Sequence, residues 1–322
     1  MDGWATARGV EVGCTVPSPN TADVVSYLEA FYAGIKVELL PSDTFTFSSW
    51  DDPATMNRKP KRTPDPPSFV ALCTPSTSIR IRVRPASPTS PYAYQLNLDD
   101  LLDGAIESLP ADAYALLLPV EHDLYESDDD EFCCGRAYGG SRVAVVSSAR
   151  YQPGLDERQG VERGHGWPAS HCASYVKGLC SDADGPSMKK TCQSDHSTLT
   201  RATDDDADTP LQAAFTASDP PLSLPNLFLS RLARTASHEL GHCLGIDHCV
   251  FYACIMQGSA SLAEDARQPP YLGPVDVAKL CEATGVGERE RLVKLREVGE
   301  KWEWGALEAR VKGRITELGT QV

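Results

Sequence analysis

The chain has 322 residues, 41% of them hydrophobic, so it is long enough to bury one or two globular cores. Its formal net charge of -15 leaves no excess of Lys and Arg to neutralise phosphates, which argues against a nucleic-acid partner. It contains no run of about 18 apolar residues, so we expect no membrane span and no membrane partner.

The expected compartment follows from the N-terminus and the cysteines. The first residues lack a basic stretch followed by an apolar run, which is the form of a secretory signal. The 11 cysteines suit reduced thiols and metal ligands better than the disulfide scaffold of a small secreted protein. We therefore expect an intracellular, cytoplasmic protein with no obligate partner. The basic run at 58–62 leaves a nuclear location open, although a solvated loop among prolines is the simpler interpretation.

The first third of the chain predicts one helix and several short strands. Thr21 is a plausible cap for a helix with apolar residues at helical spacing. Alternation of apolar and polar residues predicts a strand at 35–40, and the Pro-, Asp- and Ser-rich stretch 41–67 predicts a surface loop. Strands are expected at 68–73 and 78–84, where three arginines alternate with apolar residues, as at a sheet edge or in a hairpin.

The middle of the chain alternates between helix and strand patterns. Asn97 is expected to cap an amphipathic helix at 98–109. The apolar run 113–120 predicts a strand covered on both sides, and 142–147 predicts a further strand. A second helix is expected at 227–245. This order is typical of an α+β fold layered about one sheet.

The predicted domain plan is one large domain with two irregular interruptions. An N-terminal segment at 1–20 precedes the main domain at 21–285, and a charged helical tail follows at 286–322. Besides the loop at 41–67, the stretch 176–222 is rich in Asp, Ser, Thr and Pro and shows little periodicity, so we expect a flexible insertion.

The most informative segment is His238-Glu239-x-x-His242-x-x-Gly245-x-x-His248. Residues four apart lie on one face of a helix, so His238 and His242 can present their imidazoles to one ion. Gly245 allows the chain to leave the helix in a left-handed conformation, which turns His248 back as a third ligand. Three neutral nitrogens leave a fourth tetrahedral position for water, the arrangement of a catalytic zinc site.

The chemistry expected of this segment is hydrolysis. Zinc lowers the pKa of a bound water toward about 7, and Glu239, about 100° further round the helix, can take the proton as general base. The activated water attacks a peptide carbonyl, and Glu239 passes the proton to the leaving amine. The alternative is that the three histidines bind no metal and only pack in the core or face solvent. The pattern nevertheless falls on a predicted helix, as the mechanism requires.

The same segment carries a family resemblance. The three-histidine pattern resembles the metzincin clan of metallopeptidases, and His248-Cys249-x4-Cys254-x-Met256 resembles the archaemetzincins more narrowly. The stretch 116–150 is also similar to archaemetzincins. The resemblance implies a zincin-like catalytic domain at 21–285, with a mixed sheet, an active-site helix and a C-terminal subdomain. It further implies a peptide substrate laid along an edge strand.

Further residue roles are implied by the resemblance alone. Met256 would be the Met-turn residue, which packs beneath the zinc and does not bind it. Tyr252 and Tyr271 are both candidates for the tyrosine that supports the transition state in some metzincins, and their spacing favours neither.

A second, structural zinc held by four cysteines is also implied, but the residues fit it incompletely. Cys249 and Cys254 match the first pair of ligands, whereas Gly273 and Asp276 stand where the later pair would be. Asp276 can serve as an oxygen ligand, but Gly273 has no side chain to offer. Cys243 and Cys281 are the other candidates for the set, although neither has the family spacing, so the occupancy of this second site is left open.

The remaining cysteines give no ligand pattern. Cys133 and Cys134 are adjacent, so in an extended chain their side chains point to opposite faces and burial is more plausible than joint chelation. Within the predicted insertion, Cys180, Cys192 and His196 match no metal-ligand spacing.

The sequence therefore predicts a zinc-dependent metallopeptidase that acts on a peptide or protein substrate, with an aminopeptidase mode permitted by the resemblance. The alternative is a zinc-binding protein of the same fold with little or no peptidase activity. Retention of Glu239 argues against it, because a structural site has no use for a base there. A zinc deaminase would require a different ligand pattern.

Overall fold

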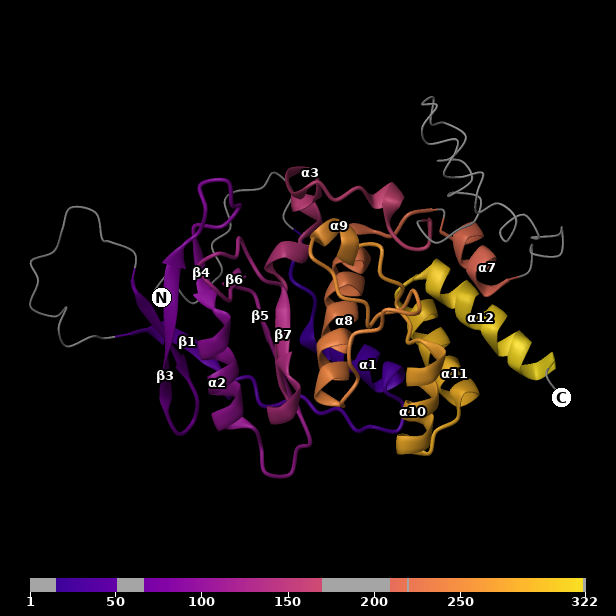
Figure 1. Cartoon of the computed structure of the whole chain (residues 1–322), viewed down its shortest axis with the longest axis horizontal. Helices are drawn as coiled ribbons and strands as arrows, with labels where there is room; N and C mark the ends of the chain where they lie inside the picture. The colour runs from indigo at the N-terminus through magenta and orange to yellow at the C-terminus, as the bar shows by residue number, and fades with distance from the viewer. Residues whose placement is uncertain (1–15, 51–66, 170–208, 219, 321–322) are drawn as a thin grey trace, which may run out of the picture. The chain divides into compact units, whose positions relative to one another are not determined.

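The computed structural model describes residues 16–50, 67–169, 209–218 and 220–320 (Figure 1). The chain divides into two compact units. Unit 1 comprises the segments 1–25, 38–156 and 228–247, and unit 2 comprises 26–37, 157–227 and 248–322. No helix in the described part of the chain has the length and apolar character needed to cross a membrane.

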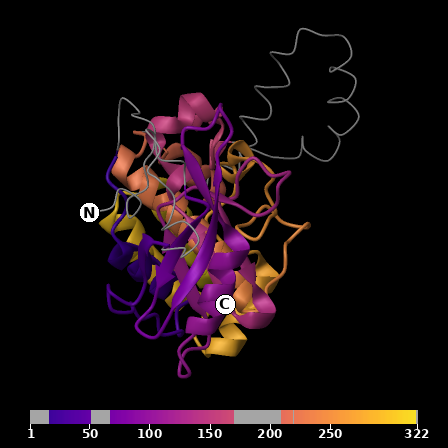
Figure 2. The same cartoon turned by 90° about the vertical axis from the view of Figure 1, so that its left-hand side faces the viewer.

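Unit 1 contains two mixed sheets. The five-stranded sheet, whose purple strands face the viewer in Figure 2, has the order β1-β2-β3-β4-β6, with β4 and β6 parallel and the other pairs antiparallel. Its strands are β1 (Thr46–Ser49), β2 (Phe69–Cys73), β3 (Ser78–Pro85), β4 (Tyr94–Asn97) and β6 (Leu124–Tyr125). The three-stranded sheet has the order β5-β8-β7, from β5 (Leu116–Val120), β8 (Val143–Ser147) and β7 (Gly135–Tyr138). In it β5 is parallel to β8, and β7 is antiparallel to β8.

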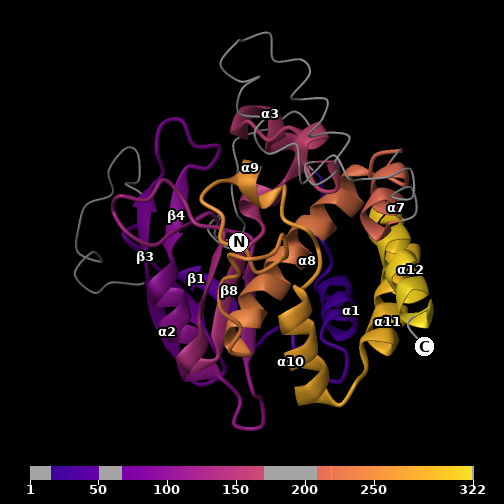
Figure 3. The same ribbon diagram turned by 45° about the vertical axis from the view of Figure 1, so that its right-hand side comes forward.

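The three-stranded sheet lies between two helices, α2 (Leu98–Ser108) and α8 (Leu224–Cys243), as Figures 1 and 3 both show. Helix α2 begins where the Asn97 side chain accepts a hydrogen bond from the Asp100 amide at 3.0 Å. All five residues of β8 are buried, as expected for a strand covered on both faces. The two sheets and α2 share one apolar core, which includes Leu72, Ile81, Leu101, Leu124 and Val145.

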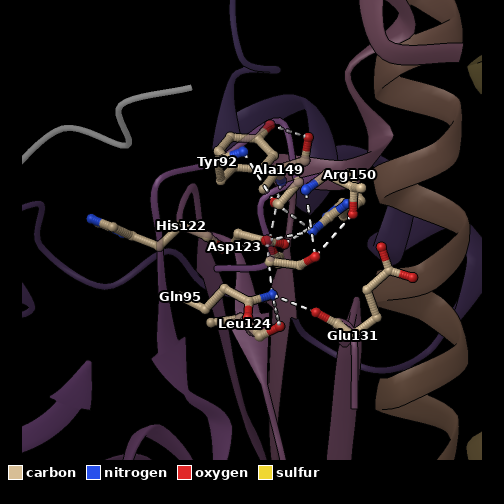
Figure 4. Close-up of polar contacts among 12 residues, drawn as sticks. Tyr92, Gln95, His122, Asp123, Leu124, Glu131, Ala149 and Arg150 are labelled. Atoms are coloured by element: carbon tan, nitrogen blue, oxygen red, sulfur yellow. Dashed lines mark hydrogen bonds and ion pairs between the residues drawn. The ribbon is translucent and has the colours of Figure 1, made fainter. Parts of the chain in front are cut away.

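A buried ion pair ties the ends of β6 and β8 together (Figure 4). The Arg150 guanidinium donates to both carboxylate oxygens of Asp123, at 2.8 and 2.6 Å, and lies 4.1 Å from the centre of the Phe132 ring. The Gln95 amide donates to the same carboxylate at 3.0 Å. Burial raises the pKa of Asp123, and the hydrogen bonds from Arg150 and Gln95 oppose that shift. The network therefore fixes the path of the chain as it leaves the three-stranded sheet.

A second buried ion pair attaches helix α8 to the segment that follows β8. The Arg231 guanidinium binds the Asp156 carboxylate through two hydrogen bonds of 2.6 and 3.0 Å, and both side chains are less than a tenth exposed. Thr235, one helical turn further on, donates to the Tyr151 hydroxyl at 2.7 Å. A bidentate pair of this kind fixes orientation as well as distance, so α8 is held in one register within unit 1.

Unit 2 is mainly helical. Its described helices include α7 (Pro210–Thr216), α9 (Leu262–Asp265), α10 (Pro274–Thr284), α11 (Glu288–Lys301) and α12 (Gly305–Thr320). Helices α11 and α12 lie side by side, and α7 packs on α12, as Figure 3 shows. Helix α1 (Thr21–Phe31) begins in unit 1 and supplies Tyr27 and Phe31 to the aromatic core of unit 2, where Trp304 lies 5.7 Å from Tyr27.

Most predicted elements of unit 1 are confirmed. Strands β2 and β3 form the predicted antiparallel hairpin, and α2, β5, β8 and α8 occur where the sequence places them. The α+β class with mixed sheets is also confirmed, but the described strands form two sheets and not the single one expected. Strand β3 lies inside its sheet, between β2 and β4, and not at an edge. Its arginines are accommodated there by polar partners: Arg82 binds Asp100 at 2.8 Å, and Arg84 binds Gln95 at 2.9 Å.

Other predictions about local structure were wrong. The stretch 35–40 forms no strand, although its pattern alternates, whereas β1 arises inside the predicted loop because Thr46–Ser49 finds β2 as a partner. Helix α1 is capped by Asn20 and not by Thr21, since the Asn20 side chain accepts from the Ala22 amide at 2.9 Å. The predicted insertion 176–222 stays a prediction, because 176–208 lies outside the described residues; its later part contains helix α7, where Thr209 caps a Pro at the first turn. Strand β5 is not fully covered, since Pro119 is exposed.

Candidate metal centre

The end of helix α8 is shaped by a glycine in the left-handed conformation. Gly245 has φ +81°, its amide donates to the His242 carbonyl at 3.0 Å, and the next amide, of Ile246, donates to the Gly241 carbonyl at 3.0 Å. These two bonds form a Schellman motif, which satisfies carbonyls that the helix end would otherwise leave unpaired. The prediction that Gly245 turns the chain out of the helix is confirmed.

The turn also orients an imidazole. The Nδ1 atom of His242 lies 2.7 Å from the Ile246 carbonyl oxygen. A carbonyl can only accept a hydrogen bond, so in the neutral ring Nδ1 carries the proton and Nε2 presents its lone pair. That Nε2 atom lies 3.1 Å from Nε2 of His238, one helical turn earlier. Two ring nitrogens directed at one point in this way are suited to a shared cation.

The third histidine of the motif joins this pair. One ring nitrogen from each of His238, His242 and His248 lies within 4.8 Å of the others, with His238 buried, His242 half-buried and His248 exposed. Three imidazoles of this spacing suit a zinc ion, and a tetrahedral ion held by them would have one position left for a further ligand. The residues present therefore fit the metal that the motif implies.

Glu239 lies on the buried side of helix α8, facing strand β7. Its side chain is 8% exposed, and its Cγ atom would stand 3.4 Å from a Cβ atom placed on Gly135. Two thiols lie in the same environment. Burial, with a further contribution from the Glu239 charge, raises the pKa of Cys133 to about 11 and that of Cys243 to about 12. Both thiols are therefore protonated at neutral pH, and Cys133 donates to the Gly135 carbonyl at 3.3 Å.

Cys249 and Cys254, two of the residues predicted for a second zinc, are hydrogen-bonded to each other. Burial and a hydrogen bond with Cys249 raise the pKa of Cys254 to about 11. A Cβ atom on Gly273 would lie 3.8 Å from the Cys254 sulfur, so the glycine stands beside the thiols. Asp276 is buried in the first turn of α10, where its carboxylate lies 3.6 Å from the Lys279 ammonium. Across the described residues, these side chains do not form a group of three ligands, and the second zinc stays a prediction.

The remaining predicted residues have other neighbours. Met256 is fully buried, and its carbonyl accepts from the Cys249 amide at 2.7 Å; its Met-turn role stays a prediction. Tyr252 is 47% exposed, while the ring of Tyr271 lies 3.3 Å below the Arg310 guanidinium. The basic run 58–62 falls outside the described residues, as do Cys180, Cys192 and His196.

The sequence did not indicate the close contact between helix α8 and the turn η1 (Gly139–Ser141) that follows strand β7. A Cβ atom on Gly139 would lie 2.7 Å from the His242 carbonyl oxygen, nearer than real Cβ atoms come. The available signal was the alternation of small residues at 135, 137 and 139, which the strand pattern alone does not connect to any partner.

Comparisons with known proteins agree with the motif. The family model of Peptidase family M54 matches residues 218–276. Human Archaemetzincin-2 is 30% identical over 197 residues, covering 61% of this chain and 44% of the relative. Human Archaemetzincin-1 is 28% identical over 226 residues, covering 69% of this chain and 38% of the relative. The chain thus spans less than half the length of these curated relatives.

Two solved structures are similar to part of the chain. The crystal structure of an archaemetzincin from Methanopyrus kandleri is 22% identical with a TM-score of 0.33, over 58% of this chain and 65% of its own. A zinc-dependent peptidase from Methanocorpusculum labreanum is 19% identical with a TM-score of 0.33, over 61% of this chain and 78% of its own. By the sequence comparisons and the histidine motif, the chain is similar to archaemetzincins, and its segment 218–276 matches the model of peptidase family M54.

Proposed function

We propose that the chain is a zinc-dependent metallopeptidase that hydrolyses peptide bonds. The observation that carries this proposal is the gathering of three imidazoles beside the buried Glu239 on the same helix. A structural zinc site is closed by four protein ligands, whereas three histidines leave a position for a reacting molecule. The M54 match over the same segment supports the assignment.

Each residue has a definite part in this proposal. His238, His242 and His248 would hold the zinc ion, with the His242 ring kept in its tautomer by the Ile246 carbonyl. When bound, zinc supplies a Lewis acid that polarises a carbonyl oxygen and makes water more acidic. Glu239 would accept the proton of the attacking water and return it to the departing amine. Glu239 is 8% exposed, so little bulk water competes for its carboxylate.

The fold suggests how a peptide substrate would bind. Strand β7 pairs with β8 along one edge, and in the described part of the chain its other edge has no strand partner. An extended peptide can add to such an edge through backbone hydrogen bonds. We propose that a peptide substrate binds along this edge of a zincin-like domain at 21–285. Cleavage would occur either within the peptide or at its amino terminus.

The decisive experiment joins metal analysis to a peptide-library assay. We expect at least one zinc per chain, cleavage by the wild type, and a kcat roughly 10²- to 10⁴-fold lower in Glu239→Gln. The control is Glu282→Gln, which removes an exposed carboxylate from α10 and should leave kcat unchanged. Cleavage that survives Glu239→Gln would refute the general base, and zinc binding without any cleavage would favour the non-enzymatic alternative. Two zinc ions per chain would show that the cysteine site is filled.

A further inference from the structure

Strand β7 has one face of small residues and one face of large ones. Gly135 and Ala137 alternate with Arg136 and Tyr138, and Gly139 follows directly as the first residue of the short 3-10 helix η1 (Gly139–Ser141). The Tyr138 hydroxyl donates to Asp99 of α2 at 2.8 Å, so the large face lies toward that helix. Since side chains alternate along a strand, the small face is turned the other way, toward α8.

The glycines bring β7 into direct contact with the metal-binding helix. A Cβ atom on Gly135 would meet the Val145 carbonyl oxygen at 3.0 Å and the Glu239 Cγ atom at 3.4 Å. A Cβ atom on Gly139 would meet the His242 carbonyl oxygen at 2.7 Å, and its next neighbour is the His242 carbonyl carbon at 3.5 Å. The segment 135–139 therefore lies against α8 at the general base of the proposed reaction and at a proposed metal ligand.

We propose that Gly139 and Gly135 are positioning residues, whose missing side chains let β7 and the turn that follows it lie against α8 and so set the positions of His242 and Glu239. This inference builds on the proposed function, because the two residues matter as ligand and base. Gly139 acts on the backbone of His242, and Gly135 acts on the side chain of Glu239. Neither glycine touches a substrate.

The expected displacement is large for a metal site. A carbon atom at 2.7 Å from the His242 oxygen must retreat by roughly 0.7 Å to reach 3.4 Å, where ordinary contact begins. The same oxygen accepts the Gly245 amide, and the turn that follows brings the Ile246 carbonyl to the His242 ring. Movement of this carbonyl therefore changes the ring orientation. Metal ligands tolerate only about 0.2 Å, and a misplacement of about 1 Å can lower a rate roughly 10²-fold.

The test compares Gly139→Ala with Gly140→Ala in the full chain. Gly140 is the next residue and is exposed, with no atom within 4 Å of its Cβ position and no positive φ, so it is a matched control. Zinc affinity is measured by competition with a chromophoric chelator, and cobalt(II) is substituted to record the ligand-field spectrum. We expect Gly139→Ala to weaken zinc binding about 10- to 100-fold and to shift the cobalt bands, with Gly140→Ala matching the wild type.

Gly135→Ala separates the base from the ligands. Its new methyl group lies nearest the Val145 carbonyl oxygen, the Val146 side chain and the Glu239 side chain, at 3.0, 3.3 and 3.4 Å. We therefore expect kcat to fall about 10-fold while KM and zinc affinity stay close to wild type. If Gly139→Ala fails to fold, Gly135→Ala still tests whether this segment positions Glu239. Wild-type zinc affinity, cobalt spectrum and kcat in folded Gly139→Ala and Gly135→Ala would overturn the proposal. If the wild type cleaves no peptide, the proposed function fails, but the zinc and cobalt measurements still test the positioning of His242.

Discussion

The left-handed glycine at the end of helix α8 gives a sharp test of how backbone conformation supports the metal centre. Gly245 has φ +81° and no atom within 4 Å of its Cβ position, so Gly245→Ala introduces no clash with a neighbour. Its cost is the conformation alone, about 1–2 kcal/mol for a residue with a Cβ atom held in the left-handed region. We expect the free energy of unfolding to fall by that amount, because alanine must adopt the strained left-handed conformation to keep the native turn.

Helix α10 provides the matched control. It ends at Gly285, which has φ +70° and likewise no atom within 4 Å of its Cβ position. Gly285→Ala should therefore lose a similar free energy of unfolding, measured in urea by circular dichroism. The two variants should differ in zinc affinity, because only the turn at Gly245 carries the carbonyl that binds the His242 ring. Equal zinc affinity in both variants, or no loss of stability in Gly245→Ala, would refute this reasoning.

Three further predictions concern stability and thiol chemistry. Asp123→Ala leaves the Arg150 guanidinium, only 3% exposed, without its carboxylate, so urea unfolding should show a loss of about 3–5 kcal/mol. Removing Glu290 from its exposed pair with Lys294 should cost less than about 0.5 kcal/mol, and a similar cost in both variants would contradict this contrast. With its pKa of about 11, Cys133 should be alkylated slowly by iodoacetamide at pH 8 and faster as pH rises, as mass spectrometry would show; fast alkylation at pH 8 would contradict the assigned burial. With free zinc near 1,000 times its Kd, bound zinc should stabilise the folded chain by about 4 kcal/mol, so removing it with a chelator should lower the melting temperature. An unchanged melting temperature would argue against the metal site.

Features set by short-range spacing were predictable from the sequence. His238 and His242 share a helix face because they are four residues apart, and Gly245 ends that helix through hydrogen bonds to residues within one turn. Asn97 caps α2 through an amide three residues later. In each case the interacting groups are neighbours along the chain, so residue type and spacing alone fix the geometry.

Features that depend on distant partners were decided by the tertiary structure. The pattern at 35–40 alternates but finds no strand to pair with, whereas Thr46–Ser49 becomes a strand because β2 lies beside it. The contact of Gly139 with the His242 carbonyl joins segments far apart in sequence. A strand pattern specifies which faces are large or small but not what each face meets, because that depends on how the whole unit packs. The sequence thus indicated the candidate ligands and base, and only the tertiary structure showed that the segment 135–139 lies against α8 beside them.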